Sequence, residues 1–308
     1  MSLVGLNGSQ KCYNRKNVIV GEDDKVYKKP STALEIGAGV AGLTVATPIQ
    51  KFVNKPFVKM AIKDMHGLAQ NGDVYINASK KALVQSGLAT KGVELVDASK
   101  LSSKELAKFA KGAIPSWLNK ILPKKYRPII EKKLQASLNT IKAGNNAAFL
   151  PNSNKILVNM EKMSGATFHE MGHALNKNSS VIGKALQKLR KPGMLLGSVA
   201  LLIGAFKRKK VEGEEPKGIS DRFTTFIKNN AGKLAFLGFV PTLVEEAMAS
   251  IKGAKMAKPL VSAEALKKIN RVNGKAWLTY FAAAVGAGLA ARTASWINDK
   301  IVSPKRIA

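Results

Sequence analysis

Four apolar runs, separated by polar and basic stretches, most constrain the fold of this 308-residue chain. Alanine and glycine are interspersed among the larger aliphatic and aromatic side chains of each run, at residues 36–49, 194–206, 234–244 and 276–291. Runs of this length and composition favour helices whose side chains are buried in a protein core or in lipid. We therefore expect a mainly α fold with apolar, membrane-embedded helices, and with a small β-hairpin or sheet as the β part of an α+β core.

The length of these runs leaves two interpretations open. A perpendicular bilayer span needs about 20 apolar residues, whereas a helix over residues 194–206 would cover only about 20 Å of about 30 Å of hydrocarbon. The runs can be core helices of a soluble, cytoplasmic protein, or short, tilted or re-entrant segments whose lysines and arginines reach the headgroups. Basic residues on both sides of residues 194–206 lead us to favour membrane association.

The charge of the chain points to the kind of surface it contacts. Fifty basic and 20 acidic residues give a formal net charge of +30, which predicts attraction to an anionic membrane surface or to nucleic acid. The aromatic share is 6%, and no zinc-finger or RNA-binding signature is present, so nucleic acid is the less favoured partner. The start of the chain lacks the pattern of a secretory signal peptide. Nothing in the sequence indicates an oligomeric state.

Shorter patterns predict local elements. Residues 147–150 and 155–158 flank a Pro-Asn-Ser-Asn turn and predict a β-hairpin, after which a helix is expected from near Ser164. Extended pieces are expected at residues 73–76 and 92–96, a capping-box helix at 102–111, a short helix between Pro115 and Pro123, a helix at 129–141 and a polar loop over 207–230.

The sequence His169-Glu170-Met171-Gly172-His173 carries the clearest chemical signal. Residues four apart on a helix share a face, so His169 and His173 can direct ring nitrogens at one ion. A catalytic Zn²⁺ takes three protein ligands and a water, and a neighbouring carboxylate can accept a proton from that water. We therefore expect His169 and His173 to be metal ligands and Glu170 to be the catalytic general base.

The third metal ligand has to come from another part of the chain. His66 is the only other histidine, about a hundred residues upstream, and we expect it to be structural. The best candidate is Glu246, because the pair Glu245-Glu246 lies among apolar residues and is costly to bury without a cation. Glu245 points about 100° away on a helix and is either the alternative ligand or a hydrogen-bond partner of a ligand. The pair can also lie on a solvated helix face.

The HEMGH motif, followed after a long insertion by a Glu-x-x-Ala helix, resembles the gluzincins, a group of HExxH zinc metallopeptidases. Within that group it looks most like the membrane-embedded peptidases of the heat-shock and prenyl-protein-processing type, which have apolar segments between the two helices. The resemblance covers residues 147–250. It implies a peptide or protein substrate and a membrane location, such as a bacterial inner membrane.

The resemblance also implies roles for individual residues. His169, His173 and Glu246 correspond to the zinc ligands, Glu170 to the general base, and the hairpin to the edge strand that binds the substrate backbone. One position departs from the pattern: the family usually has an acidic residue four positions after the ligand glutamate, and this chain has Ser250 there.

A second motif, Gly37-Ala38-Gly39-Val40-Ala41-Gly42, matches the GxGxxG fingerprint of FAD- or NAD-binding proteins. That fingerprint requires a buried strand before the glycines and a helix after them. Residues 30–35 make a poor strand, and Pro48 would break the following helix early. We therefore favour a helix packed through small residues over a nucleotide site.

The sequence thus predicts four regions: a flexible N-terminal arm at 1–30, a helical region at 31–144, a zincin-like metal-binding core at 145–250 and a C-terminal helical region at 251–308. The expected function is that of a membrane-associated zinc endopeptidase. The alternatives are a non-enzymatic basic membrane protein with a structural metal site and, less favoured, a flavin or nicotinamide protein that uses the glycine motif.

Overall fold

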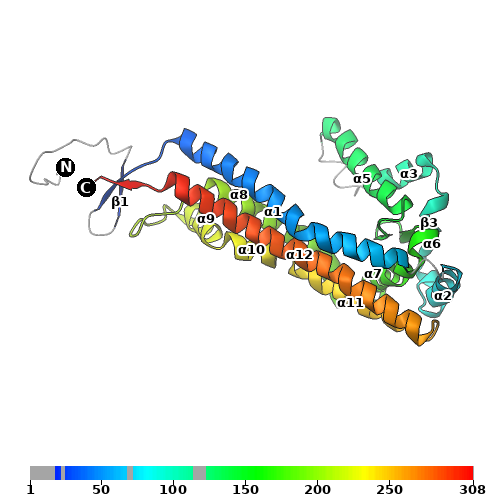
Figure 1. Cartoon of the computed structure of the whole chain (residues 1–308). Helices are drawn as coiled ribbons and strands as arrows, with labels where there is room; N and C mark the ends of the chain where they lie inside the picture. Colours follow the sequence, from blue (N-terminus) through cyan, green and yellow to red (C-terminus); the bar gives the residue numbers. More distant parts are fainter. Residues whose placement is uncertain (1–17, 22–24, 68–71, 114–122, 308) are drawn as a thin grey trace, which may run out of the picture. The chain divides into compact units, whose positions relative to one another are not determined.

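The computed structural model describes residues 18–21, 25–67, 72–113 and 123–307 (Figure 1). The fold is mostly helical with two small sheets of three strands each, which confirms the expected mainly α class. The chain divides into two compact units, and each unit is assembled from separate segments of the sequence. Residues 1–17 of the expected arm, and most of the helix expected between Pro115 and Pro123, lie outside the described residues.

Unit 1 consists of Met1–Lys51, Met194–Leu237 and Val285–Ala308. Its sheet has the order β1-β2-β6, formed by β1 (Val18–Val20), β2 (Val26–Lys28) and β6 (Lys305–Arg306), with both pairings antiparallel. The region that the sequence suggested to be a loose arm therefore contributes two paired strands.

The helical part of unit 1 is held together by close contacts between small residues. It contains parts of three long helices and two short ones, namely α1 (Thr32–Gly67), α8 (Val181–Phe206), α9 (Ile219–Asn229), α10 (Ala231–Leu237) and α12 (Ala263–Val302). A Cβ added to Gly42 would lie 2.9 Å from the Ala294 carbonyl oxygen, so α1 and α12 approach closely at this point. The apolar cluster there consists largely of buried alanines.

The glycine motif at residues 37–42 lies inside α1 and follows no buried strand, so it lacks the strand–turn–helix context of a nucleotide-binding fingerprint. The expectation that Pro48 would break a helix here is wrong, since α1 continues to Gly67. Ala46 and Ile49, on either side of Pro48, pack in the alanine-rich cluster. Packing on both sides of a proline can hold a helix together despite the missing hydrogen bond.

The stretch over residues 207–230, expected to be a polar loop, contains α9. The α9 residue Lys228 is buried, and its ammonium group donates to the carbonyl oxygens of Gly204 at 2.8 Å and Ser295 at 3.1 Å. It also contacts Asn298 Oδ1 at 3.2 Å and forms an ion pair with Asp299 at 2.9 Å. One buried cation therefore links α8, α9 and α12 within unit 1.

Unit 2 consists of Phe52–Gly193 and Gly238–Ala284. Its sheet has the order β3-β5-β4, in which β3 (Glu94–Asp97) is parallel to β5 (Lys155–Val158) and β4 (Ala148–Leu150) is antiparallel to β5. The strands β4 and β5 confirm the expected hairpin, and β3 confirms the extended piece near residues 92–96. The strand β4 is one edge of the sheet.

The extended piece expected at residues 73–76 is wrong, because these residues open the helix α2 (Gly72–Gln85). Val74, Tyr75 and Ile76 favour strands by composition. The residues that α2 buries nevertheless include Tyr75, Ala78 and Ala82, which recur at helical spacing, so packing against the core outweighs local preference.

Besides α2, five helices lie wholly within unit 2 among the described residues and pack on this sheet or on one another. They are α3 (Ser103–Ala113), α5 (Arg127–Lys142), α6 (Met160–Met163), α7 (Thr167–Ser179) and α11 (Val240–Ala257). The capping box before α3 is confirmed, since the Ser102 amide donates to the Glu105 carboxylate and the Glu105 amide donates to the Ser102 hydroxyl. The helix expected at residues 129–141 lies within α5.

Three helices are long and apolar enough to cross a membrane by length and composition: Thr32–His66, Val181–Phe206 and Ala231–Ala257, the last combining α10 and α11. The three apolar runs in them are shorter than a span, but each helix extends beyond its run through polar residues. Counting only uninterrupted apolar residues therefore underestimated the lengths of these helices. The run at 276–291 lies within the 40-residue α12.

Candidate metal centre

Two glycines let α7 and α11 touch backbone to backbone. A Cβ added to Gly172 would lie 2.0 Å from the Ala249 carbonyl oxygen, and one added to Gly253 would lie 2.3 Å from the Phe168 carbonyl oxygen. No side chain larger than hydrogen fits at either position without a backbone shift. This contact brings the histidine face of α7 against the glutamate face of α11.

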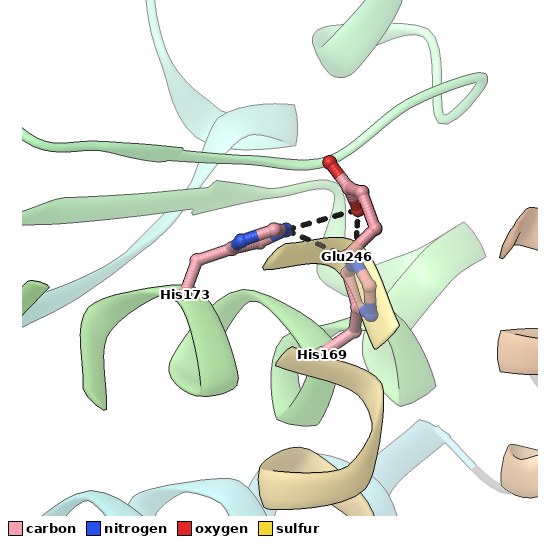
Figure 2. A group of neighbouring side chains, drawn as sticks. All are labelled: His169, His173 and Glu246. Atoms are coloured by element: carbon pink, nitrogen blue, oxygen red, sulfur yellow. Dashed lines mark hydrogen bonds and ion pairs between the residues drawn. The ribbon is translucent and has the colours of Figure 1, made fainter. Parts of the chain in front are cut away.

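The side chains of His169, His173 and Glu246 converge from these two helices (Figure 2). The two histidine Nε2 atoms are 3.0 Å apart, and Glu246 Oε2 lies 3.2 Å from His169 Nε2 and 3.3 Å from His173 Nε2. Ligands bound at typical Zn–N and Zn–O lengths in a tetrahedral site are about 3.3 Å apart. The three side chains form a group able to hold a metal ion.

The other ring nitrogen of each histidine has its own partner. His173 Nδ1 donates to Glu245 Oε1 at 2.9 Å, and His169 Nδ1 is hydrogen-bonded to the Ser250 hydroxyl at 3.1 Å. One proton on each Nδ1 and none on Nε2 would direct both Nε2 lone pairs toward Glu246, where the three electron pairs would repel one another unless a cation lay between them. This is the arrangement of metal-ligating histidines.

Glu245 is buried on the far side of His173 from Glu246. Its Oε1 accepts from Asn176 at 2.9 Å and from Gln187 at 2.8 Å, and Arg190 donates to its Oε2 at 2.8 Å. These contacts saturate the carboxylate and fix the His173 ring. In this geometry Glu245 is a hydrogen-bond partner of His173, and Glu246 is the carboxylate that faces both histidines.

The balance of buried charge also favours a cation. Glu170, Glu245 and Glu246 are 7%, 0% and 1% exposed, and Arg190 forms ion pairs with the last two, at 2.8 Å and 2.9 Å. Once His173 is neutral, as a metal ligand must be, three carboxylates against one guanidinium leave two negative charges (3 − 1 = 2). Unpaired buried charge is costly, and a divalent cation in the cluster would neutralise it.

Titration of His173 reflects the same electrostatics. Burial lowers the pKa of His173, but its hydrogen bonds to Glu245 and Glu246 and the nearby carboxylates outweigh this effect and raise the pKa to about 10. When no metal is bound, the ring therefore keeps a second proton and a positive charge at neutral pH. The site favours a positive charge at the position that a metal would take.

Glu170, the expected general base, lies beside the cluster on α7 and is also in contact with the sheet. Its Oε2 accepts a hydrogen bond of 2.6 Å from the backbone amide of Phe149 in β4. This bond orients the carboxylate and fixes the edge strand β4 against α7. The general-base candidate and the edge strand are therefore adjacent.

One histidine lies outside the cluster, and three polar residues of the site had no predicted role in it. His66 is outside the cluster, and its Nε2 donates to the Gly144 carbonyl oxygen at 2.6 Å, as expected for a structural histidine. Sequence reasoning assigned no role to Arg190, Asn176 or Gln187. Asn176 and Gln187 carry no motif, and Arg190 is accompanied by Lys188 and Lys191, so the local sequence did not distinguish it from the other basic residues before the apolar run.

Comparison of the chain with protein-family models, with curated protein sequences and with solved structures finds no match. The chemistry of the site and the composition of the helices are therefore the basis for inferring a function.

Proposed function

We propose that this protein is a zinc-dependent, membrane-associated peptidase of the gluzincin type, with an endopeptidase activity on peptide or protein substrates. The single observation that supports this most is the convergence of His169, His173 and Glu246, with Glu170 next to the first ligand on the same helix. Two imidazoles, one carboxylate and a neighbouring second carboxylate are the donor set of a hydrolytic zinc site.

Glu170 is the residue proposed to move the proton. A zinc ion at the cluster would polarise the substrate carbonyl and lower the pKa of the attacking water. Glu170 accepts a proton from that water and then donates it to the amine nitrogen of the leaving segment, so that the C–N bond breaks without an unstable amide anion. The Phe149 amide holds the carboxylate in place for both transfers.

The strand β4 is the proposed docking edge for the substrate backbone. It pairs only with β5 in its sheet, and it lies against α7 through the contact between Phe149 and Glu170. An extended peptide that adds to such an edge gains backbone hydrogen bonds and is placed in register. The hydrolysed bond would then lie next to the general base.

Membrane association is supported by the three apolar helices and by the net charge of +30. We propose that the helices at 32–66, 181–206 and 231–257 are embedded in the bilayer, and that the excess lysine and arginine contacts the anionic lipid surface, as in a bacterial inner membrane.

The second candidate function is a basic membrane protein with a structural metal site. The observation that favours it is that Glu170 has a structural contact, since its carboxylate accepts a hydrogen bond from the Phe149 amide and so fixes β4 to α7. On this hypothesis the metal would join α7 to α11 without a reaction.

Metal content and hydrolysis of a peptide library, both measured in detergent, distinguish these functions. We expect the wild-type protein to hold one equivalent of zinc, Glu170→Gln to keep zinc and lose hydrolysis, and Glu246→Ala to lose both. Glu161→Gln, at an exposed position on α6, serves as the matched control and keeps both. Stoichiometric zinc without hydrolysis of any peptide refutes the peptidase and supports the structural site.

A further inference from the structure

The helix α9 carries an exposed apolar stripe that nothing in unit 1 covers among the described residues. Ile219, Phe223 and Phe226 recur at positions i, i+4 and i+7 and are 87%, 61% and 56% exposed. Lys228, on the opposite side of the helix, is buried, and so is Ile227, which lies between the stripe and the Lys228 side. The packed face of α9 is therefore already in use, and the stripe is a second apolar face that points away from unit 1.

Basic side chains are frequent in the loop that precedes α9. In the preceding loop, Lys207 and Lys210 form ion pairs with Asp221, and Arg208 forms one with Glu214. These contacts give the loop a defined structure in spite of its dense positive charge.

Three further cations, Lys209 and Lys217 in the preceding loop and Arg222 beside the stripe on α9, are exposed and have no carboxylate partner within the part of the chain that the structure describes. An apolar face bordered by free lysine and arginine is the composition of a helix that lies in the headgroup region of an anionic membrane.

The position of α9 in the chain is consistent with contact with a membrane surface. It lies between two of the helices that are long and apolar enough to cross a membrane, one ending at Phe206 and the next beginning at Ala231. If both cross, the segment that joins them must lie at one membrane surface. Lysine and arginine in short connecting segments favour the cytoplasmic side.

We infer that α9 is an interfacial anchor: Ile219, Phe223 and Phe226 insert between the lipids of the anionic cytoplasmic leaflet, and Lys209, Lys217 and Arg222 contact the lipid phosphates. This inference rests on the proposed membrane association and adds the segment, the leaflet and the lipid class. The stripe is a lipid contact, and a protein bound at this face is an alternative outcome of the test below.

The test uses the full chain, with the single native cysteine replaced by Cys12→Ser, in vesicles of phosphatidylcholine with or without phosphatidylglycerol. An environment-sensitive fluorophore is attached through Phe223→Cys on the stripe, through Glu215→Cys in the exposed loop as a control, or through Leu195→Cys, which is 65% exposed on α8. Each label is quenched with iodide from water and with spin-labelled lipid from the bilayer.

We expect the label at 223 to be quenched by lipid, and its iodide quenching constant to be about threefold lower than that of the label at 215. Phosphatidylglycerol should strengthen the protection of the label at 223 from iodide. In the triple variant Lys209→Gln, Lys217→Gln, Arg222→Gln, this protection should no longer depend on phosphatidylglycerol.

Three outcomes overturn the inference in different ways. If lipid quenches the label at 195 but iodide reaches the label at 223, the chain is in the membrane and α9 is not an anchor. If neither label is quenched by lipid, the proposed membrane association itself is wrong. If the label at 223 is shielded from iodide and unaffected by spin-labelled lipid, a protein surface covers the stripe.

Discussion

The glycine in the middle of the HEMGH motif sets the distance between the two helices of the metal centre. Gly172→Ala would place a Cβ 2.0 Å from the Ala249 carbonyl oxygen and 2.6 Å from its carbonyl carbon. Both atoms belong to the backbone of α11, so no side-chain rotation relieves the contact. The helices must move apart, and the substitution therefore tests whether their spacing controls the site.

The size of the movement follows from the structure. Ordinary contact begins near 3.4 Å, so α7 and α11 must separate by about 1.4 Å at this point (3.4 − 2.0). The same separation, directed along the line between His169 and Glu246, lengthens their 3.2 Å contact to about 4.6 Å, too long for a shared zinc. We expect zinc to bind at least about 100-fold more weakly, and the free energy of unfolding to fall by about 1–3 kcal/mol.

The assay is competition for zinc against a chelating dye, with circular dichroism to show that the helices persist. Gly274→Ala is the matched control, because a Cβ at this α12 position meets nothing within 4 Å. It should leave zinc affinity unchanged and stabilise the helix by up to about 1 kcal/mol. A folded Gly172→Ala protein with the zinc affinity of the control refutes the argument that backbone contact sets the metal geometry.

Three other perturbations test separate parts of the structure. Ser250→Ala removes the hydroxyl that orients His169 and should weaken zinc about tenfold in the same dye assay, with Ser250→Asp restoring tight binding. Because the pKa of His173 is raised to about 10, zinc must displace a proton from this ring below that pH. Calorimetry in buffers of different ionisation enthalpy should show about one proton released on zinc binding at pH 8, and zinc affinity should rise with pH. A zinc affinity that does not change with pH contradicts this. In the metal-free protein the same raised pKa contributes stability that is fully present below about pH 6.5 and lost as the pH rises through about 10. Lys228→Met leaves the Gly204 and Ser295 carbonyls and Asp299 without their cation and should lower the free energy of unfolding by about 2 kcal/mol with zinc content unchanged, whereas the exposed Lys217→Met should have no effect on thermal unfolding.

The parts of the site that depend on local spacing could be predicted from the sequence. His169, Glu170 and His173 lie within one helix turn and a half, and helical geometry alone places the two rings on one face. Glu246 could be selected because an acidic pair among apolar residues needs a cation. The hairpin before α7 followed from its turn residues.

Other features depend on contacts between distant residues, and no local pattern encodes them. Arg190 is 55 residues from Glu245, and its role appears only once α8 packs beside α11. The strand-like Val74 and Ile76 lie in a helix because burial at helical spacing outweighs their propensity. By contrast, α9 had a readable signal in Ile219, Phe223 and Phe226, which was hidden by the charged residues around it.

The 77 residues between His169 and Glu246 give the site an order of assembly during synthesis. At translation rates of about 5–20 residues per second, α11 leaves the ribosome roughly 4 to 15 seconds after α7. Throughout that interval the nascent chain lacks Glu246, so the candidate site has only two of its three ligands and would bind a metal weakly. Residues 194–237, which separate the two segments of unit 2 on either side of them, would thus delay completion of the candidate site until they have been made. If the chain is the peptidase proposed above, it would therefore be inactive while it is being synthesised.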